Sequence, residues 1–185
     1  MGKISHNFSP MATLAKHIKN NEPNAKVIFV GPCTAKKAEA QLDEVKGLVD
    51  CVLTFEELQA LFDSKDVDLT TLAETTLDNA SVFGRIFARS GGLSQAVAQA
   101  MAEQNINFDL KPVVCNGLDE CRLALLKLNK GLLDGNFIEG MACLGGCVGG
   151  AGNLTHSTEK SAGKIDKHSQ ESAKKTITQS VADEQ

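Results

Sequence analysis

The sequence contains no tryptophan and no tyrosine, and its large aromatic side chains are limited to eight phenylalanines. A surface on which nucleotide bases or sugars stack is therefore not expected. Positive charge is not in surplus either, since 19 Lys and Arg face 23 Asp and Glu, whereas a nucleic-acid binder gathers basic residues on one face. No apolar run approaches the ~18 residues of a membrane span, and the first residues lack the apolar core of a signal peptide. We expect a cytoplasmic protein that binds neither nucleic acid nor a membrane.

The residues that are present suit a globular chain. A length of 185 residues with 42% hydrophobic content fits one good-sized domain with a hydrophobic core. Six cysteines are an unusual number for such a chain. In a reducing cytoplasm, clustered cysteines indicate metal or redox chemistry more often than disulfides. The alternative is a set of unrelated buried thiols, because free cysteine is among the residue types most often buried.

Short apolar runs alternate with stretches of helical periodicity. Strands are predicted at 26–30, 48–53, 112–115 and from 137 onward, and helices from Ser9-Pro10 onward and over 55–62, 93–103 and 118–128. The spacing of Thr54 and Glu57 is that of a capping box. The run at 26–30 is continuously apolar, which predicts a strand buried on both faces. The alternation predicts an α/β fold with a largely parallel sheet, or sheets, flanked by helices.

The last part of the chain differs in composition. Residues 157–185 contain no Phe, Leu or Met but five Lys, five acidic residues and many Ser, Thr and Gln. Such a segment has too little apolar surface to form a core. We therefore predict a folded domain over residues 1–156 and a polar C-terminal tail over 157–185, either helical or disordered.

The first segment with candidate metal-binding or catalytic residues follows the first predicted strand. Cys33 stands where that strand ends, and ligands of α/β sheets bind outside the carboxyl ends of strands. Lys36 lies one helical turn further on, on the same side, where an ammonium group lowers the pKa of a thiol or hydrogen-bonds an anionic ligand. The alternatives are an inert structural thiol and a solvated surface lysine.

The second segment is dense in glycine. Six of the thirteen residues from 140 to 152 are glycine, as is typical where a chain turns tightly or approaches a bulky group. Cys143 and Cys147, four residues apart, can point at one centre. A single zinc ion is an alternative, although the usual two-residue spacing is absent. An iron–sulfur cubane is larger, and its thiolates can come from distant parts of a chain. A disulfide between the two cysteines is the main structural alternative.

Together these segments resemble the catalytic domain of the iron-only, or [FeFe], hydrogenases. The Pro-Cys-x-x-Lys-x-x-Glu motif of that family stands here as Pro32, Cys33, Lys36 and Glu39, and its Glu-x-Met-x-Cys-x-x-x-Cys motif as Glu139, Met141, Cys143 and Cys147. Residues 86–93 are similar to the family's Phe-Gly-x-Thr-Gly-Gly segment, and residues 5–10 look like the stretch after its first motif. The resemblance spans roughly residues 4–156 and implies the fold of the hydrogenase large subunit.

The resemblance also implies a metal centre and the residues around it. In that family a [4Fe-4S] cubane is joined through one cysteine to a di-iron unit carrying CO and cyanide, together called the H-cluster. Carried over, Cys33, Cys143 and Cys147 are cubane ligands, and Cys147 is the bridge to the di-iron unit. The resemblance further implies that Lys36 hydrogen-bonds a cyanide, that Met141 packs against the di-iron unit and that Ser5 belongs to the proton path. Ser9, Pro10 and Glu39 would lie around the centre. Phe87 and Leu93 would form part of its apolar cover. An ordinary helix cap explains Ser9 and Pro10 equally well, and core packing is the alternative for the apolar residues.

The sequence departs from the family at several points. The first motif, whose adjacent cysteines supply the fourth cubane ligand and the proton-donating thiol, is missing, and its place would precede Met1. We therefore expect the chain to be the distal part of a catalytic domain. Gly31, where many members have Met, and the altered stretch 150–154 indicate a sensory or otherwise divergent branch. Three cysteines lie outside the motifs and are predicted to be buried structural thiols: Cys51, Cys115 and Cys121.

The expected function is that of part of a hydrogenase-like iron–sulfur domain. In the complete protein this would be reversible dihydrogen oxidation and proton reduction in anaerobic metabolism, or dihydrogen sensing, with ferredoxin or another electron carrier and the upstream part of the same domain as partners. Because the proton-donating cysteine is absent, we expect the isolated chain to show little or no turnover. The alternatives are a non-catalytic iron–sulfur module related to cytosolic cluster-assembly proteins and a cluster-free α/β interaction domain.

Overall fold

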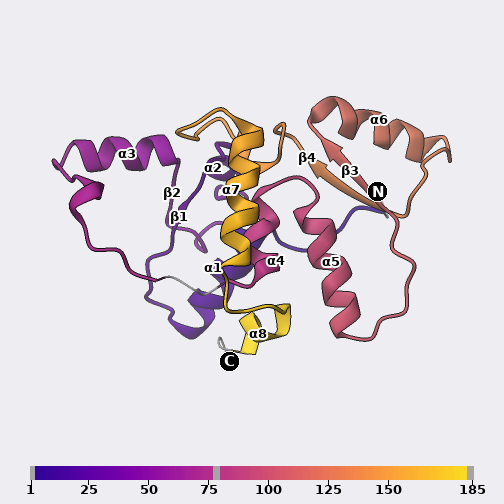
Figure 1. Cartoon of the computed structure of the whole chain (residues 1–185), viewed down its shortest axis with the longest axis horizontal. Coiled ribbons are helices and arrows are strands. Elements are labelled where there is room, and N and C mark those ends of the chain that lie inside the picture. Colours follow the sequence, from indigo (N-terminus) through magenta and orange to yellow (C-terminus); the bar gives the residue numbers. More distant parts are fainter. Residues whose placement is uncertain (1–2, 77–79, 183–185) are drawn as a thin grey trace. The chain divides into compact units, whose positions relative to one another are not determined.

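The computed structural model describes residues 3–76 and 80–182 and divides into two units (Figure 1). Unit 1 contains the chain up to Thr70 together with Ala151–Leu154, and unit 2 contains Thr71–Gly150 and the chain from Thr155 onward. Within the described residues, each unit has its own pair of parallel strands. None of the helices described in these two ranges has both the length and the apolar character that crossing a bilayer requires.

Unit 1 is built around the strands that follow the first helix. Its elements are α1 (Pro10–Asn21), β1 (Ile28–Val30), α2 (Ala35–Glu39), β2 (Cys51–Leu53) and α3 (Phe55–Asp63), followed by a 3-10 turn at Leu69–Thr71. The Ser9 hydroxyl oxygen accepts the N–H of Ala12 at 3.3 Å, which caps α1. At α3, Thr54 and Glu57 form the reciprocal capping box that their spacing predicts. Both of these predicted helices are therefore confirmed, and local side-chain chemistry defines where they begin.

The core of unit 1 lies on one side of its strand pair. Its buried residues are Met11, Ala12, Ala15, Ala40, Val45, Val49 and Val52, with Phe29 packed against them. The neighbours of Phe29 face away, since Ile28 is 58% and Val30 36% exposed. The prediction that this strand is buried on both faces was therefore wrong, because a two-stranded sheet has its core on one face here. The prediction of a buried Cys51 was wrong for the same reason, since this residue is exposed beside Ile28 in the register.

Unit 2 carries the second strand pair. Its elements are α4 (Val82–Arg85), a 3-10 turn (Ile86–Ala88), α5 (Gly92–Glu103), β3 (Pro112–Asn116), α6 (Leu118–Asn129), β4 (Phe137–Met141), a 3-10 turn (Cys147–Gly149), α7 (Thr158–Gln170) and α8 (Ile177–Ala182). Strands β3 and β4 are parallel, with Asn116 opposite Met141 at their carboxyl ends. Helix α6 packs along this pair, as Figure 1 shows. The fold is thus α/β, with parallel strands flanked by helices.

The polar C-terminal segment belongs to unit 2. Helix α7 packs against α4 and the neighbouring 3-10 turn. The Arg89 guanidinium donates to the Asp166 carboxylate of α7 at 2.5 Å, and the buried Ser172 hydroxyl donates to the Ala80 carbonyl oxygen at 2.8 Å. The segment therefore joins the rest of unit 2 in good part through hydrogen bonds, which partly replace the apolar burial that its composition lacks.

A carboxylate holds the start of α8. Glu103, the last residue of α5, accepts the Thr178 hydroxyl at 2.6 Å and the backbone N–H groups of Thr178 and Ile177 at 2.8 and 2.9 Å. These bonds, with the Thr178 hydroxyl first, lower the pKa of Glu103 from 4.5 to about 2. Since this pKa is lower in the folded chain, the stabilisation is complete above pH 4.5 and is lost as pH falls towards 2.

We therefore expect Glu103→Gln to release α8 at neutral pH, because the neutral amide removes the ionised acceptor. Amide hydrogen exchange across 177–182 should be several-fold faster than in the unaltered chain. Glu159→Gln, a change at an exposed position of α7, serves as the control and should leave that exchange unchanged. Equal protection of α8 in both variants would contradict the role of Glu103.

Candidate functional site

Cys33 lies at the carboxyl end of β1, where the sequence places it. The strand pairing extends to the Gly31 N–H, which donates to the Leu53 carbonyl oxygen at 3.1 Å. The next residue, Pro32, accepts the N–H of Gly152 at 2.9 Å. Gly152 is buried, and a Cβ there would lie 2.5 Å from the Cβ of Thr54, so this approach requires glycine. Cys33 is half-buried, and it directly follows Gly31 and Pro32, whose backbone groups are hydrogen-bonded to Leu53 and Gly152.

Lys36 and Glu39 form an ion pair one turn apart on α2. The Lys36 ammonium contacts one oxygen of the Glu39 carboxylate, and the Ser9 hydroxyl donates to the other. The Lys36 side chain is only 23% exposed, so the alternative of a solvated surface lysine does not describe it. The three groups together form a charged cluster next to Cys33 in sequence.

A cavity of about 750 Å³, with a mixed polar and apolar lining, lies beside this cluster. It is lined by Ser5, His6, Asn7, Phe8, Ser9, Ala38, Glu39, Leu42, Glu44 and Val45. The predicted residues Ser5, Ser9 and Glu39 therefore share one cavity, a proximity that their separation in the sequence does not show. Pro10 begins α1 and is exposed, and its position is explained by the helix cap.

Cys143 and Cys147 lie on a tight turn after β4. Between them Gly145 and Gly146 have φ values of +81° and +89°, a region that favours glycine. The Gly146 N–H donates to the Cys143 carbonyl oxygen at 3.1 Å, and both cysteines are half-buried. The structure holds all six cysteines as thiols, so the disulfide between Cys143 and Cys147 is not formed.

Glu139 is the largest fully buried side chain of the described residues, at 1% exposure. From β4 it accepts the N–H of Gly91 at 2.8 Å, and the N–H and hydroxyl of Ser94 at 2.8 and 2.6 Å. These donors belong to the N-terminus of α5, where a negative charge is stabilised by the helix dipole. Glu139 belongs to a predicted motif in which it had no assigned role, and the sequence signal for this role is an acidic residue within a strand.

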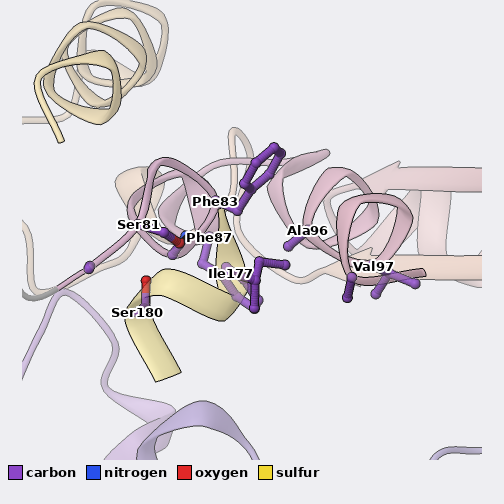
Figure 2. A pocket seen from close by; sticks show the side chains of 10 residues that line it. Ser81, Phe83, Phe87, Ala96, Val97, Ile177 and Ser180 are labelled. Atoms are coloured by element: carbon purple, nitrogen blue, oxygen red, sulfur yellow. Dashed lines mark hydrogen bonds between the residues drawn. The ribbon is translucent and has the colours of Figure 1, made fainter. Parts of the chain in front are cut away.

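The apolar residues predicted near the centre all lie in unit 2. Phe87 lines an apolar cavity of about 440 Å³ together with residues of α4, α5 and α8 (Figure 2). Leu93 is half-buried in the first turn of α5. Met141 is half-buried at the end of β4, and its carbonyl oxygen accepts the Gly117 N–H at 2.8 Å. Their predicted contacts with a metal centre stay predictions.

The remaining predicted structural thiols lie beside β4. Cys115 is buried at 2% exposure, as predicted, and burial together with the nearby Cys121 raises the pKa of its thiol. Cys121, which was also predicted to be buried, is only half-buried, and its thiol lies 3.7 Å from the Met141 carbonyl oxygen. A thiol with a raised pKa is a poor nucleophile and metal ligand, which favours a structural role for Cys115.

Within the described part of the chain, metal-ligating side chains do not gather into a site for a single ion. Across residues 3–76 and 80–182, no three His, Cys, Asp or Glu side chains lie together as such a site. Cys33 belongs to unit 1, whereas Cys143 and Cys147 belong to unit 2. The single zinc ion considered from the sequence therefore gains no support from the described residues.

Comparison with known proteins places these features in a family context. The family model described as iron only hydrogenase large subunit, C-terminal domain, matches residues 1–151. Iron hydrogenase 1 of Clostridium pasteurianum is 28% identical, over 77% of this chain and 31% of that protein. A probable cytosolic Fe-S cluster assembly factor of Anopheles gambiae is 25% identical, over 76% of this chain and 38% of that protein.

Solved structures of [FeFe]-hydrogenases also match the fold of this chain. An [FeFe]-hydrogenase structure matches with a TM-score of 0.69 and 18% identity, over 95% of this chain and 62% of that one. A variant of the HydA1 [FeFe]-hydrogenase of Chlamydomonas reinhardtii matches with a TM-score of 0.64 and 18% identity, over 95% and 63%. The chain thus spans about a third of the length of the curated relatives, and less than two thirds of the solved chains.

Proposed function

The chain belongs to the family of the iron-only hydrogenase large subunit, C-terminal domain, and from this premise we propose that it supplies three thiolate ligands to a [4Fe-4S] cluster. The family is one of iron–sulfur proteins, and the proposed ligands are Cys33, Cys143 and Cys147. In the complete domain Cys147 would also hold the di-iron unit of an H-cluster. When bound, this group supplies the chemistry that interconverts dihydrogen with protons and electrons.

The turn from Cys143 to Cys147 carries this proposal. Its two thiols are not joined in a disulfide and both are half-buried, and the two glycines between them have left-handed φ values that let the chain turn tightly from one cysteine to the other. Thiolates are the protein ligands of such clusters. The chain then continues for five residues to Gly152, which donates to the carbonyl oxygen of Pro32, directly before Cys33.

The polar cluster of unit 1 suits the transfer of protons and the binding of an anionic ligand. The Lys36 ammonium would donate to such a ligand while Glu39 keeps it in place. The Ser9 hydroxyl donates to the same carboxylate, and Ser5 lines the adjoining cavity. A proton would pass between these hydroxyl and carboxylate groups. Apolar Phe87, together with Leu93 and Met141, would exclude water from the centre.

For the whole protein we propose a cytoplasmic oxidoreductase or dihydrogen sensor. It would exchange electrons with ferredoxin or another carrier and would need the upstream part of the domain for the fourth cubane ligand. A second candidate is a non-catalytic iron–sulfur module, which the 25% identity to a probable cytosolic Fe-S cluster assembly factor favours. Infrared bands of iron-bound CO and cyanide in the native protein distinguish the two, because only the hydrogenase site carries these ligands.

Anaerobic reconstitution with iron and sulfide tests the proposed cluster. We expect the chain to take up about four iron and four sulfide ions, and the double variant Cys143→Ser, Cys147→Ser to lose most of that uptake, because thiolates are the ligands of such clusters. Cys51→Ser removes an exposed thiol outside the motifs and is the matched control, with uptake equal to that of the unaltered chain. Absence of stoichiometric uptake by the unaltered chain would instead favour a cluster-free α/β interaction domain.

A further inference from the structure

The turn between Cys143 and Cys147 is held from outside by Asn116, the last residue of β3. The side-chain oxygen of Asn116 accepts the N–H of Gly145 at 2.5 Å and the hydroxyl of Ser90 at 3.1 Å. Asn116 lies outside the motifs at 32–39, 86–93 and 139–147. The contact joins two segments that are 29 residues apart in the chain.

Ser90 completes a clamp around the same glycine. Its backbone N–H donates to the Gly145 carbonyl oxygen at 3.0 Å, while its hydroxyl donates to Asn116. Both polar backbone groups of Gly145 are thereby fixed, one by Asn116 and one by Ser90. The next residue, Gly146, is buried with no room for a side chain, since a Cβ there would lie 2.6 Å from the Ser90 nitrogen.

Asn116 is itself well anchored, as a positioning group must be. It pairs with Met141 at the end of the β3–β4 ladder, and its N–H donates to the Glu120 carboxylate at 2.7 Å. The turn it holds begins two residues after Met141. The hydrogen bonds of Asn116 and Ser90 therefore fix the cysteine turn to the carboxyl end of the β3–β4 strand pair.

We propose that Asn116 is a positioning residue for the cluster-binding turn, fixing the Gly145 peptide and through it the direction of the Cys143 and Cys147 thiols. This role rests on the proposed function. A neutral amide oxygen provides the acceptor without adding charge. A carboxylate in its place would keep the acceptor but bring a negative charge near the cluster, and net charge and hydrogen bonding around a cluster set its reduction potential.

The test uses two variants of the full chain and a control, Asn136→Ala, at another asparagine whose side-chain oxygen accepts a backbone N–H. Asn116→Ala removes the acceptor, and Asn116→Asp keeps it with a charge. The Asn136 side-chain oxygen also accepts a backbone N–H, that of Lys111 at 2.7 Å, but it does so at the amino end of the β3–β4 pair, whereas Asn116 and the cysteine turn are at its carboxyl end. Each is examined without metal and after anaerobic reconstitution.

We expect Asn116→Ala to speed amide exchange at Gly145 at least tenfold in the metal-free chain and to speed iron release to a chelator by a similar factor. Asn116→Asp should keep the iron content and shift the cluster's reduction potential to a more negative value. Asn136→Ala should change none of these readouts, even if it lowers the melting temperature.

The proposal is overturned if Gly145 exchange is unaffected by Asn116→Ala. It is equally overturned if exchange rises while iron release and reduction potential in the Asn116 variants match those of Asn136→Ala, because Asn116 would then act on the fold alone. Failure of the unaltered chain to take up iron is a separate result, which would overturn the proposed function and this role with it.

Discussion

Replacing Glu139 by alanine is expected to lower the free energy of unfolding by about 3 kcal/mol or more. The carboxylate accepts two backbone N–H groups and one hydroxyl at the start of α5, and its side chain is almost completely buried. Alanine leaves the N–H groups of Gly91 and Ser94 without their acceptor and creates a cavity between β4 and α5. Unfolding in urea, followed by circular dichroism, measures the change.

Two further variants separate the origins of this loss. Glu139→Gln keeps one oxygen acceptor but removes the charge that interacts with the helix dipole, so it should fall between alanine and the unaltered chain. Glu159→Gln at an exposed position of α7 should change stability by less than about 0.5 kcal/mol. If Glu139→Ala also changed the free energy of unfolding by less than about 0.5 kcal/mol, α5 would not depend on this carboxylate.

The second large effect is expected from Gly146→Ala. A Cβ at this position would lie 2.6 Å from the Ser90 nitrogen and 2.8 Å from the Arg89 carbonyl carbon, both of them backbone atoms that cannot move aside cheaply. The residue also has a φ of +89°. We expect a loss of about 3 kcal/mol in stability from the strain and overpacking together, and at least a tenfold loss of iron uptake, because the turn between the cysteines must change shape.

Gly47→Ala is the matched control for this substitution. Gly47 has nearly the same backbone conformation, with a φ of +88°, but no atom lies within 4 Å of the Cβ that alanine would add. Its cost should be that of the left-handed conformation alone, about 1 kcal/mol, with unchanged iron uptake. Equal effects of the two substitutions would contradict the close contact between Gly146 and the Arg89–Ser90 backbone.

Local chemistry explains what could be predicted from the sequence. The capping box of Thr54 and Glu57 acts over three residues, and the parallel strands follow from short apolar runs separated by helices. The family motifs are likewise short and depend on spacing along the chain, so they identify the family before any fold is known. The predicted ends of the helices at 55–62, 93–103 and 118–128 lie within one or two residues of the observed ends, because capping residues and glycines mark helix ends.

Long-range contacts explain what could not be predicted. The partners of Glu139 are 45 and 48 residues away, and nothing in the local pattern identifies them. The exposure of Ile28 and Cys51 depends on the strand pair having only two members, which an apolar run does not reveal. Helix α7 packs on α4, and its Asp166 pairs with Arg89, a residue 77 positions away that the composition of residues 157–185 does not reveal.

The return of Ala151–Leu154 to unit 1 has a consequence for synthesis on the ribosome. The first 70 residues leave the exit tunnel long before the segment whose Gly152 bonds to Pro32 has been translated. At roughly 5 to 20 residues per second, this delay is about 4 to 16 seconds. During that interval the N-terminal strand pair exists without its last segment, while the whole of β3 and β4 emerges behind it.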